Sequence, residues 1–151
     1  MTAPKPTGHA LASPVILPWM PGPSAAMTGP VVVSVTEYQS TQRRDLPGVV
    51  GKGMRMRLGW YAMPGAVGLW LWSLPARLCG GSISVWDNEE SLERFITLPH
   101  HTAIMDRYRD RGNVRSNQWT MQRFDAEATL SRARDWITTD TTTAASIADC
   151  Q

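Results

Sequence analysis

The feature that most constrains the fold is a pair of apolar segments joined by only three residues. The first, residues 66–74, alternates tryptophan with leucine, and the second, roughly 78–86, alternates serine with isoleucine and valine before it ends at Trp86. Strict alternation places successive side chains on opposite faces of an extended strand. With Pro75-Ala76-Arg77 as the link, the two segments predict an antiparallel hairpin.

The segments on either side of the hairpin predict alternating strands and helices. Residues 31–38 are rich in β-branched side chains, which favours a strand, and residues 114–124 predict a fourth strand. Helices are expected at 46–63, at roughly 87–111 with a break near Pro99, and at 126–137 after a cap at Asp125. The order β-α-β-β-α-β-α predicts an α+β fold of the ferredoxin-like βαββαβ type, an antiparallel four-stranded sheet with two helices on one face.

Two local patterns refine the helices. In the helix at 46–63, four apolar residues recur at spacings of four, four and three, which places them on one helical face. These residues are Val50, Met54, Leu58 and Tyr61. At the start of the next helix, Asp87 is expected to be the N-cap, with Glu90 completing a capping box.

Composition is typical of a single-domain protein and excludes several classes of function. The 151 residues are 42% apolar and 19% charged, which suffices for a buried core. A net charge of +2 does not indicate nucleic-acid binding. No apolar run reaches the roughly 18 residues of a membrane span, so no membrane partner is expected either. Cys79 and Cys150 form no zinc pattern and no disulfide framework, so we expect no metal and a reduced, cytoplasmic protein.

The two ends of the chain differ from its middle. Residues 1–30 hold seven of the eleven prolines, which predicts an extended arm, because proline lacks an N–H and keeps its predecessor extended. The apolar patch around Trp19 is expected to lie against the body of the protein or against a partner subunit. Residues 138–151 are rich in threonine and predict a loose tail, which leaves 31–137 as the folded domain.

One face of the predicted sheet has no helix to cover it. An exposed patch of tryptophans would be a strong association surface, so we expect a homodimer in which two sheets face each other. A mixed aromatic and hydroxyl lining also suits a small-molecule cavity. The residues expected on this face are Trp70, Trp72, Ser84, Trp86, Asn117 and Trp119.

Three stretches carry a resemblance to a known family. They are the sequence PGAVG at 64–68, the sequence SISVWDNEESL at 82–92 followed by Phe95, and His101 with Met105 four residues later. This pattern resembles the dimeric α/β-barrel superfamily, and is most similar to the antibiotic biosynthesis monooxygenase-like proteins, over roughly residues 45–120. The resemblance implies the fold more specifically than the activity, because one architecture serves many chemistries.

The resemblance implies a cofactor-independent monooxygenase that acts on an aromatic or polyketide-like molecule in secondary metabolism. In such enzymes a deprotonated substrate gives an electron to O₂, and no bound cofactor is needed. The protein must bind a flat polycycle, favour the anion and keep out bulk water. A cyclase or isomerase, a haem-binding or haem-degrading protein and a non-catalytic ligand-binding module are the alternatives on the same fold.

Eight residues are candidates for the site, each with a purely structural alternative. Trp86 corresponds to a pocket tryptophan of the family, and His101 is a candidate general base because neutral imidazole titrates near neutral pH. The amide of Asn117 could orient a carbonyl or a peroxy intermediate. As structural alternatives, Trp86 could pack in a dimer core, His101 could form a hydrogen bond beside Pro99, and Asn117 could form a cross-strand hydrogen bond. The expected substrate contacts are Trp70, Trp72, Ser84, Trp119 and Tyr108.

Overall fold

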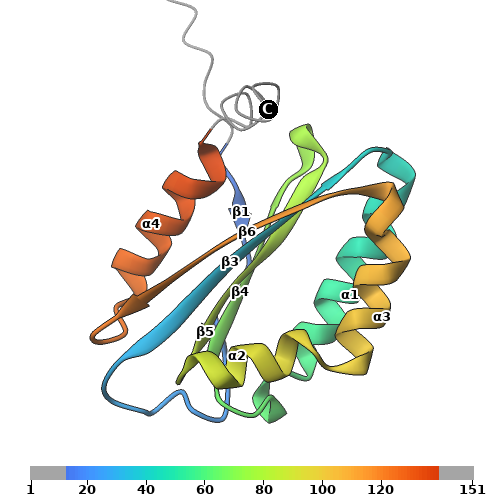
Figure 1. Cartoon of the computed structure of the whole chain (residues 1–151). Helices are drawn as coiled ribbons and strands as arrows, with labels where there is room; N and C mark the ends of the chain where they lie inside the picture. Colours follow the sequence, from blue (N-terminus) through green and yellow to red (C-terminus); the bar gives the residue numbers. More distant parts are fainter. Residues whose placement is uncertain (1–12, 140–151) are drawn as a thin grey trace, which may run out of the picture.

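The computed structural model describes residues 13–139, and it arranges them in three layers. A central sheet lies between α1, α2 and α3 on one side and α4 on the other (Figure 1). We call these sides the helix side and the α4 side. The elements are β1 (Val15–Ile16), β2 (Met20–Pro21), β3 (Val31–Ser40), α1 (Leu46–Leu58), β4 (Ala66–Leu74), β5 (Cys79–Trp86), α2 (Glu89–Ile96), α3 (Pro99–Tyr108), β6 (Gly112–Met121) and α4 (Ala126–Thr138).

The sheet has the strand order β6-β3-β5-β4-β1, and all pairs are antiparallel. The two central strands, β3 and β5, are flanked by β6 and β4, which is the ferredoxin-like arrangement expected from the order of elements. The arm adds two very short strands, β1 and β2, that both pair with the outer edge of β4. Residues 1–12 and the tail from 140 onward lie outside the described residues.

The ends of the helices follow local sequence signals, with one shift. Pro99 begins α3 and separates it from α2, and Asp125 caps α4 by accepting a bond from the Ala128 N–H at 2.9 Å, both as predicted. The N-cap of α2 is Asn88 and not Asp87. Asp87 instead accepts a hydrogen bond from the Ser91 hydroxyl at 2.6 Å, while Asn88 accepts one from the Ser91 N–H. Both side chains therefore bind Ser91 in the first turn of α2.

The apolar face predicted for α1 does not pack on the sheet. Val50, Leu58 and Tyr61 are 54%, 65% and 70% exposed. The inner side of the helix is instead the one with Gly53, where an added Cβ would sit 3.7 Å from Leu71 on β4. That distance is an ordinary van der Waals contact. Met56, on the same side of the helix, packs against the buried cluster that contains Trp60 and Leu71, so the predicted apolar stripe faces outward.

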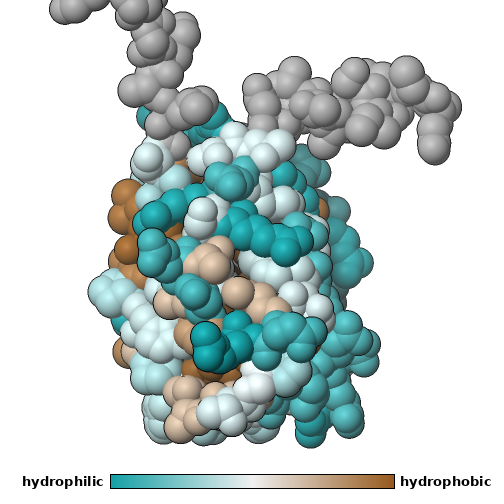
Figure 2. All heavy atoms as spheres, turned by 90° about the vertical axis from the view of Figure 1, so that its left-hand side faces the viewer, coloured by the Kyte–Doolittle hydropathy of each residue, from teal (hydrophilic) through white to brown (hydrophobic). Residues whose placement is uncertain are grey.

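The second face of the sheet is covered, and the expectation that it is open was wrong. A core on the α4 side joins Val33 and Val35 of β3 to Ala133 and Ile137 of α4. The arm covers the rest of this face, because the ring of Trp19 lies over Gly68 and within 4.3 Å of the Trp70 ring. Figure 2 shows this side of the molecule, where hydrophilic surface predominates and apolar patches are scattered. The chain therefore covers by itself the surface for which a facing sheet of a second copy was expected.

The hairpin of β4 and β5 has a four-residue connection, one residue longer than predicted. Leu74 pairs with Cys79, and Leu78 adopts a left-handed conformation with φ 55°. As a consequence Trp70 pairs with Ile83, while Ser84 pairs with Leu69. Paired residues share a face, so the tryptophans of β4 lie on the α4 side and the serines of β5 lie on the helix side.

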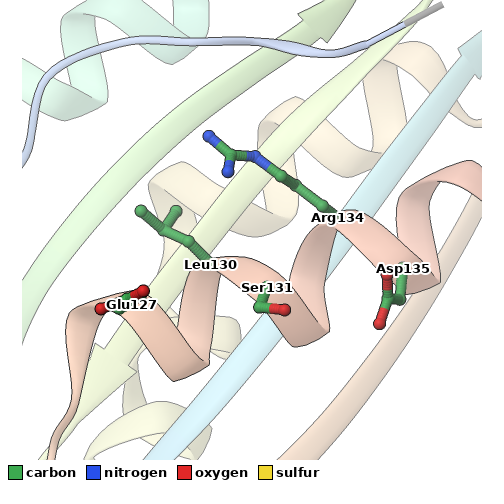
Figure 3. Close-up of a pocket in the computed structure, with 5 residues that line it drawn as sticks. All are labelled: Glu127, Leu130, Ser131, Arg134 and Asp135. Atoms are coloured by element: carbon green, nitrogen blue, oxygen red, sulfur yellow. The ribbon is translucent and has the colours of Figure 1, made fainter.

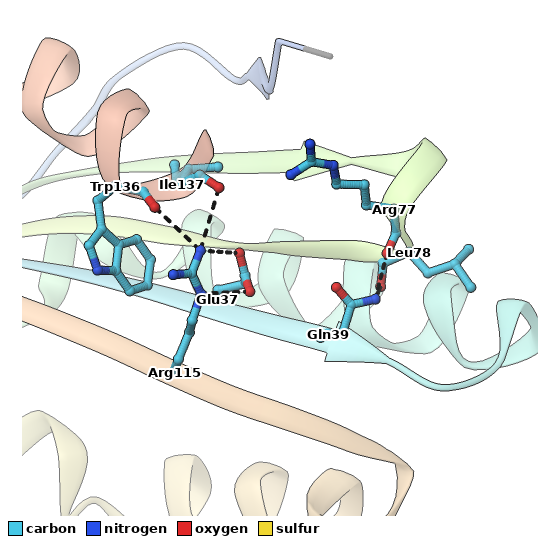
Figure 4. A network of polar contacts seen from close by, with 7 residues as sticks. All are labelled: Glu37, Gln39, Arg77, Leu78, Arg115, Trp136 and Ile137. Carbon is cyan, nitrogen blue, oxygen red and sulfur yellow. Dashed lines mark hydrogen bonds and ion pairs between the residues drawn. The ribbon is translucent and has the colours of Figure 1, made fainter. Parts of the chain in front are cut away.

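A buried ion pair attaches α4 to the sheet (Figure 4). Arg115 of β6 donates two hydrogen bonds to the carboxylate of Glu37 on β3, at 2.8 and 3.0 Å, and the Glu37 side chain is only 5% exposed. The same guanidinium donates to the carbonyls of Trp136 and Ile137 in the last turn of α4 and lies 4.1 Å from the Trp136 ring centroid. Arg115 thereby satisfies a buried carboxylate and the carbonyl end of a helix together.

Replacing Arg115 by Met should destabilise the fold by about 3 kcal/mol, because it leaves a buried carboxylate without its partner. The measurement is urea unfolding followed by circular dichroism. The matched control is Arg109→Met, which removes an even shorter pair with Asp106, at 2.6 Å, whose side chains are 73% and 65% exposed. Exposed pairs contribute about 1 kcal/mol or less. Equal losses in the two variants would contradict the assignment of Arg115 as the clamp of α4.

Candidate functional site

An aromatic cluster lies between the sheet and the helix layer. The ring of Trp86, at the end of β5, lies 5.2 Å from the rings of both Trp60 and Phe95, and the latter two are 5.5 Å apart. Trp60 and Trp86 are fully buried, and Phe95 of α2 is partly buried. We call these three residues the helix-side aromatic cluster. Three large rings from three different segments thus pack against one another in edge-on and tilted contacts.

The indole N–H of Trp86 already has a partner within the sheet. It donates to the Ser84 hydroxyl at 2.9 Å, and that hydroxyl lies 3.4 Å from the Ser34 carbonyl of the neighbouring strand. Two of the expected site residues are therefore in contact, as neighbours on one strand face. The bond fixes the Trp86 ring and uses the donor that a substrate oxygen would otherwise receive.

His101 adjoins the cluster and has a defined tautomer. Its ring lies 4.7 Å from the Phe95 ring, and its Nδ1 lies 3.2 Å from the Ile96 carbonyl. A carbonyl only accepts, so Nδ1 carries the proton and Nε2 holds the lone pair of the neutral ring. Burial lowers the pKa of His101, and the neighbouring His100 lowers it further, against the opposing effect of the carbonyl. The imidazole is therefore neutral at pH 7 with Nε2 available as a base.

Hydroxyl groups line the sheet beside this cluster. Thr36 of β3 and Ser82 of β5 are paired across the two central strands, and their hydroxyl oxygens lie 2.8 Å apart. Both side chains are only partly buried although they lie on central strands. On the neighbouring β6, the side chains that point to the helix side are all exposed, namely Val114, Ser116, Gln118 and Thr120. The helix layer thus leaves uncovered a strip of sheet formed by Thr36, Ser82 and the exposed side of β6. We call this strip the hydroxyl floor.

A second pair of rings closes the other end of this floor. Tyr108, at the end of α3, is buried, and its ring meets the Tyr38 ring edge-on at 5.9 Å. The Tyr38 hydroxyl donates to the Tyr108 carbonyl at 3.2 Å, and burial raises the pKa of Tyr38. Gly48 allows α1 to approach, since an added Cβ would lie 2.7 Å from the Tyr108 hydroxyl. The floor is therefore bounded by aromatic side chains at both ends.

Two surface hollows of the described residues are lined by none of the predicted site residues. One, of about 140 Å³, lies beside Phe95 and is also lined by Met63, Pro64, Ser91, Arg94 and Leu98. Drug-sized ligands occupy pockets of roughly 300–1,000 Å³, so this hollow is too small for a polycycle. The other, of about 330 Å³, runs along α4 and is lined by that helix alone, through Glu127, Leu130, Ser131, Arg134 and Asp135 (Figure 3).

The predicted site residues fall on both faces of the sheet, so the expectation of a single tryptophan-lined face was wrong. The helix side holds Trp86, Ser84, His101 and Tyr108, and the α4 side holds Trp70, Trp72, Trp119 and Asn117. The second group has packing partners of its own. Trp119 lies under the Arg132 guanidinium at 4.5 Å, and the Asn117 amide oxygen accepts from the Gln118 N–H at 3.0 Å.

Trp60 is the site residue that the sequence pattern missed. It follows the glycine that ends α1 and lies in a short 3-10 turn, so no helical or strand period includes it. Its indole N–H is buried and has no partner among the described residues. Within residues 13–139, no cluster of three or more His, Cys, Asp or Glu side chains could hold a metal ion.

The lowered pKa of His101 is directly measurable. In a ¹H–¹⁵N NMR titration, His101 should protonate below its ordinary value of about 6.5 and show the Nδ1–H tautomer above it. The His101 pKa is higher in the unfolded chain than in the folded one, so the unfolded chain binds this proton at a higher pH. The contribution of His101 to stability is therefore complete above about pH 6.5 and declines as the pH falls through the lowered pKa. A titration above about 6.5, or an Nε2–H tautomer, would contradict the assigned hydrogen bond.

Comparison with known proteins supports the fold at low sequence identity. No family model and no curated protein sequence matches the chain. Among solved structures, a mutant form of SnoaB from Streptomyces nogalater, a cofactor-independent oxygenase, aligns with a TM-score of 0.50 and 15% identity over 64% of this chain and 97% of its own. LmHde, a heme-degrading enzyme from Listeria monocytogenes, aligns at 0.50 and 20% over 67% of each chain.

A conserved protein from Methanosarcina mazei Go1 aligns at 0.50 and 12%, over 62% of this chain and 93% of its own. At these identities the comparisons concern the fold alone, and the strand order found here agrees with it. The chain thus has the ferredoxin-like fold of these oxygenase-related and heme-degrading proteins.

Proposed function

We propose that the chain is a cofactor-independent monooxygenase acting on an aromatic, polyketide-like small molecule in secondary metabolism. The observation that carries the proposal is the neutral His101, whose ring packs on Phe95 of the helix-side aromatic cluster, on the same side of the sheet as the hydroxyl floor. A base held neutral by burial, beside flat apolar walls, suits the deprotonation of a phenol or an anthrone. SnoaB, which is described as a cofactor-independent oxygenase, has the same fold and adds support by analogy.

The proposed chemistry divides the work between the substrate and the protein. His101 Nε2 accepts a proton from the substrate, and the resulting anion transfers an electron to O₂. The two radicals combine to a peroxide anion at the former CH₂ carbon. This anion takes the proton back from His101, and the resulting hydroperoxide loses water to give the carbonyl. One substrate and one O₂ thereby give one quinone and one water. The protein contributes a base, a flat binding surface and partial exclusion of water.

In this proposal the substrate lies over the hydroxyl floor and not in the hollow beside Phe95. The hydroxyls of Thr36 and Ser82 lie between the two aromatic ends and offer donors to a developing phenolate. Trp86 acts as a positioning residue, because its N–H is held by Ser84 and its ring supports Phe95, on which His101 packs. We assign Trp70, Trp72, Trp119 and Asn117 to packing on the α4 side.

The proposal retains a homodimer, O₂ as co-substrate and a reduced, cytoplasmic setting. Cys79 is a free thiol, and burial raises its pKa to about 11, so it stays protonated and unreactive at pH 7. A homodimer could not form by facing sheets while α4 and the arm cover the second face. Its interface would therefore lie on another surface of the chain.

The test is O₂ consumption with a hydroxylated anthrone as the probe substrate. The protein should accelerate the reaction over buffer, and His101→Gln should lower kcat by about 100-fold, the usual contribution of a general base. The rate should fall at acid pH, as Nε2 becomes protonated below the ordinary histidine pKa. The matched control is His100→Gln, which changes the exposed neighbour and should retain activity.

Two further measurements separate the alternatives on the same fold. Product formation under argon would contradict the oxygenase and favour a cyclase or isomerase. A strong visible band after addition of haem, lost in His101→Gln, would contradict the cofactor-free reaction and favour haem binding. An anthrone that reacts no faster with the protein than without it would also contradict the proposal.

A further inference from the structure

The outward side of α1 combines exposed apolar side chains with cations that lack an acidic partner. Four residues form what we call the α1 stripe, and they are 54%, 36%, 65% and 70% exposed. They are Val50, Met54, Leu58 and Tyr61, in that order. No residue of α1 is buried, although the helix lies against the sheet. Val50, Met54 and Leu58 share one face of α1, and Tyr61 lies on the short 3-10 turn that follows it. Isolated exposed apolar residues are ordinary, but a group of this kind marks an interaction surface.

The charges around the stripe all have the same sign. The segment 46–86 contains four cationic residues and no Asp or Glu. Three of the cations, Lys52, Arg55 and Arg57, lie on α1, and at 100° per residue Arg55 and Arg57 flank the stripe on opposite sides. In the part of the chain that the structure describes, none of the three makes an ion pair, and Arg57 donates to the neutral carbonyl of Pro18. Long cationic side chains that border an apolar stripe can extend to an anionic layer while the apolar residues enter a less polar one.

We propose that α1 docks on an anionic lipid bilayer surface, with the α1 stripe at the level of the headgroups. The position of α1 allows this contact, because it lies in the outer layer, on the opposite side of the sheet from α4 (Figure 1). Tyr61 at one end of the stripe has the amphipathic ring typical of membrane interfaces. This inference does not depend on the proposed oxygenase, although a surface-bound protein would have direct access to apolar substrates dissolved in the bilayer.

The charges favour this occupant over a second copy of the chain. An interface between two α1 stripes would bring four flanking arginines together, Arg55 and Arg57 of each copy, with no acidic side chain of α1 to offset them, which opposes self-association. Among residues 13–139, no helix is long and apolar enough to cross a membrane. The sequence-based expectation of no membrane partner concerned such a span, whereas surface docking requires only one amphipathic face.

The experiment is flotation of the full chain with vesicles of phosphatidylcholine alone or with phosphatidylglycerol added. The protein should float with the anionic vesicles, bind at least about tenfold more weakly to the neutral ones, and dissociate as salt is raised. Leu58→Asp and Arg55→Glu should each reduce binding by about tenfold or more. The controls are Val15→Asp, at a similarly exposed apolar residue of β1, and Arg134→Glu on α4, and both should bind like the parent chain.

Circular dichroism and light scattering on the same variants complete the test. A folded Leu58→Asp variant that still floats with anionic vesicles would overturn the proposal, as would failure of the parent chain to float. A dimer of the parent chain that Leu58→Asp converts to a monomer would assign the stripe to a second copy and would also overturn it. Because flotation is measured without substrate, these outcomes are independent of the oxygenase assay.

Discussion

The register between β4 and β5 determines where every other part of this molecule can act. The four-residue connection pairs Leu74 with Cys79, so the tryptophans of β4 share a face with Ile83 and Val85. Ser84 and Trp86 are thereby placed on the opposite face, toward α2. A connection one residue shorter would exchange the two faces, because side chains alternate with a period of two. Leu78 permits the observed connection at the cost of a left-handed backbone conformation, which is unfavourable for a side chain with a Cβ.

Once the tryptophans lie on the α4 side, that side becomes a packed core. Trp19 of the arm, Phe124 and α4 cover the rings of β4, and the Glu37–Arg115 pair attaches the last turn of α4 to the sheet. The Glu37 carboxylate is enclosed and Arg115 is partly buried. Loss of the pair is therefore costly, although its formation required the desolvation of charge, so the pair contributes position more than stability. The covered face leaves the helix side as the only side of the sheet, among residues 13–139, with an exposed strip of strand.

The helix side combines two requirements that oppose each other. A base that is neutral at pH 7 needs burial, which His101 obtains beside Phe95, and a substrate needs access, which the uncovered part of β6 provides. On the same side of the sheet, the hydroxyl floor has a partly buried polar pair, Thr36 and Ser82, across the two central strands. Hydroxyls paired across strands tolerate partial burial without an isolated polar group, and they can exchange that bond for one to a ligand.

Sequence alone was sufficient for the elements from residue 31 onward and their order, because these depend on local signals, whereas the two short strands of the arm were not predicted. The break at Pro99, the cap at Asp125 and the alternation in β4 and β5 are properties of neighbouring residues. The sequence also singled out His101 and Trp86, which the structure joins through Phe95.

Only the tertiary structure decided which face each element presents. One extra residue in a turn reassigned four tryptophan and serine positions. The side of α1 with Met56 packed on the core and left the apolar stripe outward, and α4 covered a face expected to be open. Register, helix rotation and coverage depend on contacts between distant segments, so local periodicity indicates that a face exists but not what lies against it.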